Sequence, residues 1–254
     1  MNVCLRNCVF IPTLLLSIVS GQAIADHHWD GSKASFGFNM TTGNSKSTAS
    51  NGEFDVDYQF GDNVHSVWKS TSALAFQYGK SNGVDNKEQY SVQTQISRSF
   101  NHNAKVDNFM YVNGSFQSNK YTSFDQQSLL SVGYGRDWIT GKKINFSTQF
   151  GPAYQDTLAN VAGAEHKHQL AAKFSSVFKW KCFVHGNLEE DFSFVTAKLV
   201  NTSKSVTSYT DNIDKNLALN LSYTVNYVSN IPAGSKKTNK FDTTTSANLV
   251  YSFS

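Results

Sequence analysis

Residues 243–254 read TTTSANLVYSFS, and this C-terminal stretch decides the fold class. Every second residue is apolar or small, whereas the residues between them are mostly polar. The apolar series consists of Ala247, Leu249, Tyr251 and Phe253. Because successive side chains of a β-strand point to opposite faces, this alternation predicts a strand with one apolar and one polar face. The last residues of a soluble domain usually fray, so two aromatic residues among the last four favour a strand held in place with one face in lipid.

The same alternation recurs along the rest of the chain. In GEFDVDYQF, residues 52–60, Phe54 and Val56 alternate with Asp55 and Asp57. We predict about twelve strands, with ten as the alternative, at residues 34–40, 52–60, 68–78, 90–100, 108–117, 129–138, 143–153, 167–181, 184–194, 204–213, 216–228 and 242–254. No convincing helical pattern interrupts them, so the sequence predicts one all-β domain.

The composition favours a membrane barrel over other β-rich classes. Charged residues make up 16% of the chain and aromatic residues 13%, and disordered chains are poor in aromatic residues. In lipid an unpaired backbone edge is very costly, so strands that cross a membrane close into a barrel and the last strand pairs with the first. We therefore predict a transmembrane antiparallel up-and-down β-barrel at residues 33–254, with a soluble β-sandwich as the alternative.

Residues 1–25 have the features of a cleaved signal peptide. Arg6 precedes an apolar run at residues 9–19, and Ala23-Ile24-Ala25 forms a small-x-small cleavage site. The apolar run is too short for a membrane-spanning helix, which needs about 20 residues. We expect residues 26–32 to form a short periplasmic segment before the barrel and the mature chain to reach the outer membrane.

The connections between the predicted strands alternate in length. The longer, polar ones are at residues 79–87, 118–126, 156–166, 196–204 and 229–240. Outer-membrane barrels have short periplasmic turns and long external loops, so we expect both termini on the periplasmic side. This orientation puts Trp68, Trp138 and Trp180 at the periplasmic edge. Two aromatic girdles are then predicted, the second consisting of Tyr78, Tyr90, Tyr154 and Tyr227.

The predicted inner face carries charges of both signs. The inward side chains include Lys69, Lys173, Lys179, Gln93, Gln95, Glu189 and Asp191. Such a mixture is compatible with an open lumen and with a plugged one, because twelve strands lie between the filled eight-stranded and the open sixteen-stranded barrels. Glu190 falls on the lipid face, so we expect a β-bulge or a register shift there. Arg98 and Arg136 also face outward, near an edge where a long side chain can reach the headgroups.

The sequence contains no recognisable catalytic constellation, and we predict no enzymatic activity, no cofactor and no site residues. A nucleophilic serine requires a histidine partner, and the chain has no His-x-Ser. We expect Asp55 and Asp57 to be solvated lumen residues. His166 and His168 share a strand face, but two ligands do not close a metal site. If cleavage follows residue 25, the new terminus at residues 26–28, Asp-His-His, could chelate Cu(II) or Ni(II).

Four stretches resemble a known family. They are FGFNMTTGNSKSTA at residues 36–49, GYGRDWI at 133–139, FGPAYQ at 150–155 and the ending LSYTVNYVSNIPAGSKKTNKFDTTTSANLVYSF at 221–253. The chain resembles the salt-induced outer-membrane proteins of domain-of-unknown-function family 481, which includes the YdiY-like proteins. The resemblance implies an outer-membrane barrel of a Gram-negative bacterium, without enzymatic activity, cofactor or settled molecular function.

Three functions remain open at this point. The barrel could be a narrow channel for small solutes, or a structural barrel whose long external loops bind lipopolysaccharide or partner proteins. A soluble periplasmic ligand-binding β-protein is the third. The expected partners are outer-membrane lipids, lipopolysaccharide and the outer-membrane assembly machinery. A net charge of +3 is too small to indicate nucleic acid.

Overall fold

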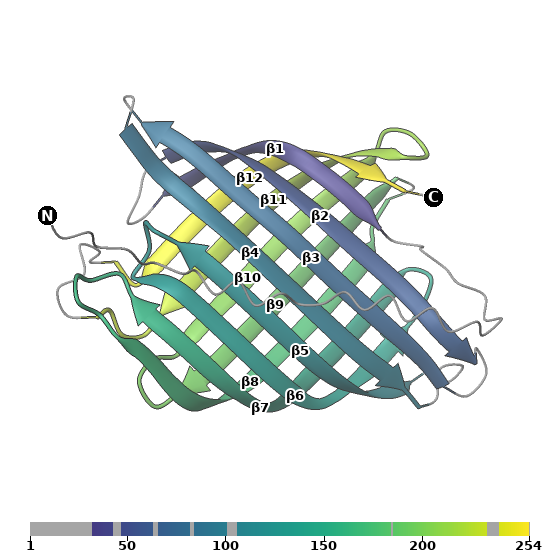
Figure 1. Cartoon of the computed structure of the whole chain (residues 1–254). Coiled ribbons are helices and arrows are strands. Elements are labelled where there is room, and N and C mark those ends of the chain that lie inside the picture. The colour runs from purple at the N-terminus through teal and green to yellow at the C-terminus, as the bar shows by residue number, and fades with distance from the viewer. Residues whose placement is uncertain are drawn as a thin grey trace, which may run out of the picture.

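The computed structural model describes residues 32–42, 47–62, 66–81, 84–100, 106–183, 185–232 and 239–253. Within these residues, twelve antiparallel strands close into a barrel in which β1 pairs with β12 (Figure 1). The strands are β1 (Lys33–Thr42), β2 (Ser47–Asp62), β3 (Ser66–Ser81), β4 (Val84–Ser99), β5 (Asp107–Asn119), β6 (Phe124–Thr140), β7 (Ile144–Ala159), β8 (His166–Lys181), β9 (Gly186–Ala197), β10 (Thr202–Asn212), β11 (Leu217–Val228) and β12 (Phe241–Ser252). The predicted up-and-down barrel is confirmed, with twelve strands rather than ten. No helix in the described residues is long and apolar enough to cross a membrane.

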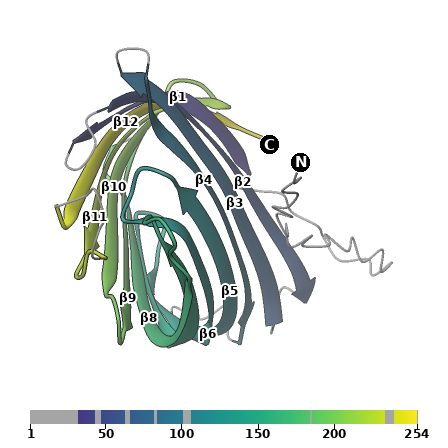
Figure 2. The ribbon, with the colours of Figure 1, turned by 60° about the vertical axis from the view of Figure 1, so that its left-hand side comes forward.

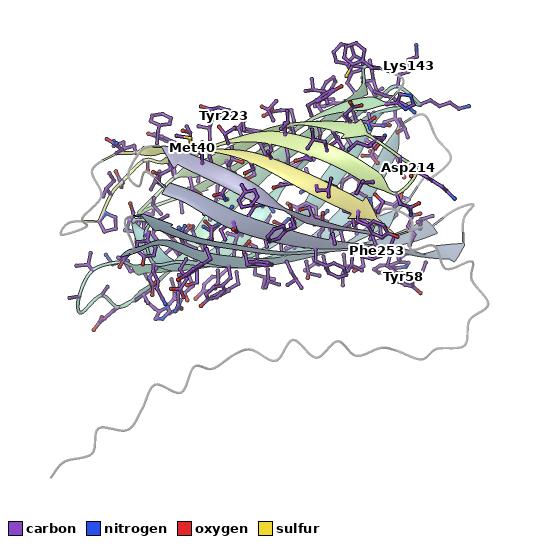
Figure 3. The ribbon with its side chains drawn as sticks, turned by 90° about the horizontal axis from the view of Figure 1, so that it is seen from above. Met40, Tyr58, Lys143, Asp214, Tyr223 and Phe253 are labelled. Carbon is purple, nitrogen blue, oxygen red and sulfur yellow. The ribbon has the colours of Figure 1, made fainter. Side chains whose placement is uncertain are left out.

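The alternation of the sequence becomes the two faces of the barrel wall. Phe38 and Met40 of β1 point outward and are 63% and 61% exposed, whereas Asn39 between them points inward and is buried. Leu170 of β8 is 80% exposed on the same outer face. Figure 3 shows outward side chains, Met40 and Tyr223 among them, standing away from the wall. An apolar outer face around a closed barrel is the surface that lipid requires.

The seam between β12 and β1 is a ladder of ten residue pairs. Gly37 of β1 lies on its inner side, between Asn51 of β2 and Asn248 of β12. Asn51 Nδ2 donates a hydrogen bond to Asn248 Oδ1 at 2.9 Å, across the glycine. A Cβ at Gly37 would lie 2.1 Å from the backbone carbonyl oxygen of Ala247 and 2.2 Å from that side-chain oxygen, so the close approach of β1 to β12 requires glycine here. The C-terminal strand is therefore paired on both edges, as its sequence predicts.

β6 and β7 approach each other very closely near their middles. A Cβ on Gly151 would lie 2.1 Å from the carbonyl oxygen of Val132, and a Cβ on Gly133 would lie 2.9 Å from the Cα of Gly151. Pro152 follows directly and has no N–H to donate to the ladder. The two glycines therefore let two backbones meet at a point where the wall carries almost no side-chain bulk.

The prediction of five long external loops is mostly wrong. β3 ends at Ser81 and β4 begins at Val84, so most of residues 79–87 belongs to strands. The connections after β5, β7 and β9 cover residues 120–123, 160–165 and 198–201, each shorter than predicted. Polar residues continue to pair as hairpins beyond the apolar band, because backbone hydrogen bonds do not depend on an apolar face. Only the connection at residues 229–240 keeps its predicted length among these five.

The tryptophan girdle forms where the sequence predicts it. Trp68 lies near the start of β3, and Trp138 and Trp180 lie near the ends of β6 and β8, so all three are at the barrel end where β1 begins and β12 ends. The guanidinium of Arg136 lies 4.5 Å from the centre of the Trp138 ring, and that of Arg98 lies 5.5 Å from the Trp68 ring. Cation–π contact therefore holds both outward arginines at this girdle.

The β-bulge or register shift predicted at Glu190 is wrong. β9 pairs continuously with both β8 and β10, and Glu190 stays in register opposite Phe178 and Thr207. Its carboxylate accepts hydrogen bonds from Ser205 Oγ at 2.6 Å and from the Thr207 hydroxyl. Two hydroxyl donors on β10 satisfy the charge, so the backbone does not need to turn it inward.

Candidate functional site

The barrel interior is polar, and on one side it is also tightly packed. Lys173 of β8 is 8% exposed, and its Nζ donates to Asn113 Oδ1 of β5 at 2.8 Å. The side chain reaches past β7 and β6, where Gly151 and Gly133 leave room for it. A buried lysine needs such a partner, because an unpaired buried charge is very unfavourable.

A second long hydrogen bond runs beside the first. Gln149 Nε2 of β7 donates to Ser175 Oγ of β8 at 2.8 Å and lies 3.3 Å from Gln95 Oε1 of β4. We call Gln95, Asn113, Gln149, Lys173 and Ser175 the inner network. Figure 2 shows β5, β6, β8 and β9 curving around this side of the barrel. The inner network fills the lumen along this part of the wall.

The rest of the described inner wall carries exposed charges. Glu53, Lys69, Asp191 and Lys204 all point inward, yet they are exposed. Polar groups that face the inside of a closed barrel and remain accessible must border open space that water can enter. The lumen is therefore filled beside β5–β8 and accessible beside β2, β3, β9 and β10.

Opposite charges are interleaved around this accessible space. Lys33 Nζ lies 3.4 Å from Asp55 Oδ2 between β1 and β2, and Lys179 Nζ lies 2.9 Å from Glu189 Oε1 between β8 and β9. Electrostatic interactions also cross the lumen, from Lys33 to Glu189 and from Glu53 to Lys204. We call this set the charged cluster, and it consists of Lys33, Glu53, Asp55, Lys179, Glu189, Asp191 and Lys204.

The charged cluster and the inner network meet at Lys173, which interacts electrostatically with Asp191. With Lys173 included, four lysines face four carboxylates, so this part of the lumen has no net formal charge. A ring of one sign selects ions by charge, whereas a balanced ring does not.

The two histidines singled out in the sequence meet a carboxylate that the sequence did not reveal. His166 Nδ1 lies 2.9 Å from Asp156 Oδ2, and His168 Nδ1 lies 3.3 Å from Asp156 Oδ1. Nearby, a hydrogen bond to Glu88 raises the pKa of the Lys120 ammonium above its ordinary value. Across the described residues, no group of three His, Cys, Asp or Glu side chains is arranged to hold a metal ion. The signal peptide predicted at residues 1–25 and the Asp-His-His terminus that its cleavage would create lie outside the described residues.

The inward positions predicted from the sequence are confirmed, but their grouping was not foreseen. Alternation alone places Lys69, Lys173, Lys179, Glu189 and Asp191 inside. It does not show that Lys173 is buried whereas Lys204 is exposed. The sequence signal that could have distinguished the two lysines is the glycine pair Gly133 and Gly151, in the GYG and FGP stretches. Gly151 is the register partner of Lys173, so these glycines leave room beside this lysine.

A shallow hollow lies on the outer face of β6–β9, behind the glycine pair. It measures about 400 Å³, and its lining includes Gly133, Gly151, Phe150, Phe174 and Phe194. The three phenylalanines point outward, and the two glycines have no side chain to close the wall behind them. The hollow therefore opens toward the membrane rather than toward the lumen.

Comparison with known proteins gives the family. The model of the family described as "Protein of unknown function, DUF481" matches residues 34–253, which is nearly the whole barrel. The chain belongs to the DUF481 family. No curated protein matches the sequence.

Solved structures similar to this family member are outer-membrane barrels. The NanC porin has a TM-score of 0.57 at 7% identity, covering 87% of this chain and 100% of its own. An outer-membrane channel from Pseudomonas putida F1 has a TM-score of 0.55 at 10% identity, covering 88% and 96%. The KdgM porin in complex with disordered oligogalacturonate has a TM-score of 0.50 at 8% identity, covering 87% and 99%. At these identities the likeness concerns the fold alone.

Proposed function

We propose that this chain is a narrow outer-membrane channel for small hydrophilic solutes. The observation that carries the proposal is the exposure of inward charged side chains, Glu53, Lys69, Asp191 and Lys204, inside a closed barrel. The inner network takes up part of the bore, so the passage is narrower than a twelve-stranded wall alone would allow. In this proposal residues 1–25 are a signal peptide, both termini lie in the periplasm, and transport involves no catalysis.

Solute charge is expected to matter little in this channel. Equal numbers of lysines and carboxylates form the charged cluster together with Lys173, so neither anions nor cations are favoured overall.

The alternative of a loop-binding barrel has less support. It relied on five long external connections, and four of these are shortened because their residues pair as strands. Binding of lipopolysaccharide or of partner proteins through the remaining connection at residues 229–240 stays a secondary proposal.

A pair of neighbouring substitutions tests the channel. Gln93 of β4 points into the accessible lumen and is exposed, whereas Val92 points outward and is 40% exposed. Purified protein should give stepwise conductance in a planar bilayer. Gln93→Trp should lower that conductance and Val92→Trp, with the same added bulk on the lipid face, should leave it unchanged. A silent wild-type recording, or an equal effect of both variants, would contradict the proposal.

A further inference from the structure

The inner wall of the barrel has a charged part and a neutral part. The charged cluster comes from β1, β2 and β8–β10. Along the middle of β4 and β5, by contrast, every inward side chain is polar and uncharged. These side chains are Gln89, Ser91, Gln93, Gln95 and Ser97 on β4 and Asn113, Ser115, Gln117 and Asn119 on β5. A solute that passes along these two strands therefore meets carboxamides and hydroxyls instead of charges.

Four glutamines of this neutral part lie close together and are accessible. Gln117 of β5 pairs in register with Gln127 of β6, and it also lies opposite the residue midway between Gln89 and Gln93 on β4. Gln93 is exposed and the other three are partly exposed. Side chains of directly paired residues start only about 5 Å apart. We call Gln89, Gln93, Gln117 and Gln127 the amide patch.

The amide patch keeps hydrogen-bonding groups that the protein does not use. Asn119 Nδ2 donates to Gln89 Oε1 at 2.8 Å. Within the residues that the structure describes, the side chains of Gln93, Gln117 and Gln127 make no hydrogen bond to another protein group. Each of these carboxamides therefore presents two N–H donors and one carbonyl acceptor to the lumen.

We propose that the amide patch binds uncharged, hydroxyl-rich solutes, which makes saccharides the solute class of this barrel. A sugar hydroxyl both donates and accepts, so it pairs with either end of a carboxamide. These hydrogen bonds replace the water that the solute loses in a narrow passage, and a polar solute without such replacement is excluded. An ion gains little at the patch, because no charge faces it there. This solute class rests on the proposed channel function, since the patch faces the same lumen.

The position of the amide patch suits a solute that enters the barrel. Gln89 and Gln93 precede Gln95 of the inner network on β4, which runs toward the tryptophan girdle. Gln117 follows Asn113 of the same network on β5, which runs the opposite way. The patch therefore lies between the inner network and the barrel end away from the tryptophan girdle. A solute from that end contacts the patch before it reaches the narrowed part of the lumen.

Block of the ion current by a neutral sugar tests the solute class. Maltotriose added to open channels in a planar bilayer should lower the current in a saturable manner. Two probes of similar size should give no saturable block: a poly(ethylene glycol), which lacks hydroxyl donors along its chain, and triglycine, which is a zwitterion. A linear response to maltotriose would overturn the proposal. Equal saturable block by triglycine would do so as well, because it would assign solute binding to the charged cluster.

Matched glutamine substitutions locate the sugar. Gln93→Met and Gln117→Met nearly keep the side-chain length and remove the amide, so the double variant should bind maltotriose at least about fivefold more weakly. Gln59→Met on β2 is the control, because Gln59 also points inward and is exposed but lies opposite Lys69. It should leave sugar binding unchanged. The open-channel current before sugar is added shows that each variant has folded, and equal weakening by the control would refute the patch.

Titration calorimetry separates the sugar site from the channel function. Purified protein in a detergent without a sugar headgroup should bind maltotriose whether or not it conducts ions, and the Gln93→Met, Gln117→Met variant should bind it more weakly. Conductance without sugar binding would refute the saccharide and leave the channel in place. Sugar binding at the patch with a silent bilayer would refute the channel and leave the saccharide site in place.

Discussion

Two parts of the barrel wall treat polar side chains in opposite ways. Beside β5–β8, Asn113, Lys173 and Ser175 face inward and are buried in the inner network. Beside β2 and β10, Glu53 and Lys204 also face inward, but they are exposed in the charged cluster. Polarity of the inner face therefore does not by itself indicate a channel. The two parts differ in the residues beside the long side chains. On the β5–β8 side the neighbouring positions are glycines, so a long side chain can lie along the wall, whereas on the other side they carry side chains of their own.

The largest loss of stability should come from adding a side chain at the glycine pair of β6 and β7. Gly151→Ala places a methyl group 2.1 Å from the carbonyl oxygen of Val132, so β6 and β7 must separate. We expect a loss of about 3 kcal/mol or more, as for severe overpacking. Urea unfolding in lipid vesicles would measure it.

Gly114→Ala on β5 is the control for this substitution. No atom lies within 4 Å of a Cβ built at Gly114, so the change should stay within about 0.5 kcal/mol of wild type. If both variants lose the same stability, the close approach of β6 and β7 is not what the glycines provide.

The second-largest loss of stability is expected at Lys173, the lysine beside the two glycines. Lys173→Ala removes the donor that satisfies Asn113, which is 0% exposed, and should cost about 1–3 kcal/mol. It should also raise single-channel conductance, because the inner network recedes toward the wall. Both quantities are measurable on the same preparation.

Lys179→Ala serves as the comparison within the same strand. Its side chain is 56% exposed, and its ion pair with Glu189 is partly solvated, so its loss should change stability by less than about 1 kcal/mol. Unchanged conductance in Lys173→Ala would show that the filled side of the lumen does not limit the passage.

A smaller loss of stability is expected from a substitution at the seam between the first and last strands. Asn51→Ala removes the hydrogen bond to Asn248 across Gly37 and should cost about 1 kcal/mol. Hydrogen exchange should rise in β1 and β12 more than elsewhere. Asn220→Ala, which removes a 2.8 Å hydrogen bond to Thr210 between two adjacent strands, should not raise exchange at the seam. Equal exchange at the seam in both variants would mean that the side-chain contact across β1 does not hold it.

Alternation of side chains was sufficient to predict the barrel, because a period of two assigns each residue to lipid or lumen without any knowledge of its neighbours. Phe36 and Leu249 point outward, and Lys69 and Glu189 point inward, as the sequence predicts. The strand ends were predicted poorly. At residues 79–87 the sequence is polar, but pairing of the backbone continues regardless of polarity.

Contacts that depend on registration between strands could not be predicted from one sequence. Burial of Lys173 requires Gly151 beside it and Gly133 on the strand beyond, and this adjacency appears only when the register of β6, β7 and β8 is known. The hydroxyl partners of Glu190 come from β10 in the same way. Alternation in the sequence predicts whether each side chain points toward lipid or toward the lumen. Only the register between strands shows which side chains on one face are neighbours.

The smallest effect on stability comes from the charged cluster, yet it is informative about transport. Lys33→Ala removes an ion pair whose lysine is 49% exposed, so the loss should be below about 1 kcal/mol. The cluster then carries one uncompensated carboxylate at Asp55, and the reversal potential across a salt gradient should shift toward cation preference. Asp55→Asn should shift it the opposite way, and the double variant should return it close to the wild-type value, because the balance of charges is restored. Shifts of the same sign in both single variants would mean that the passage does not run past this pair, whereas opposite shifts would locate the path of ions on the accessible side of the lumen.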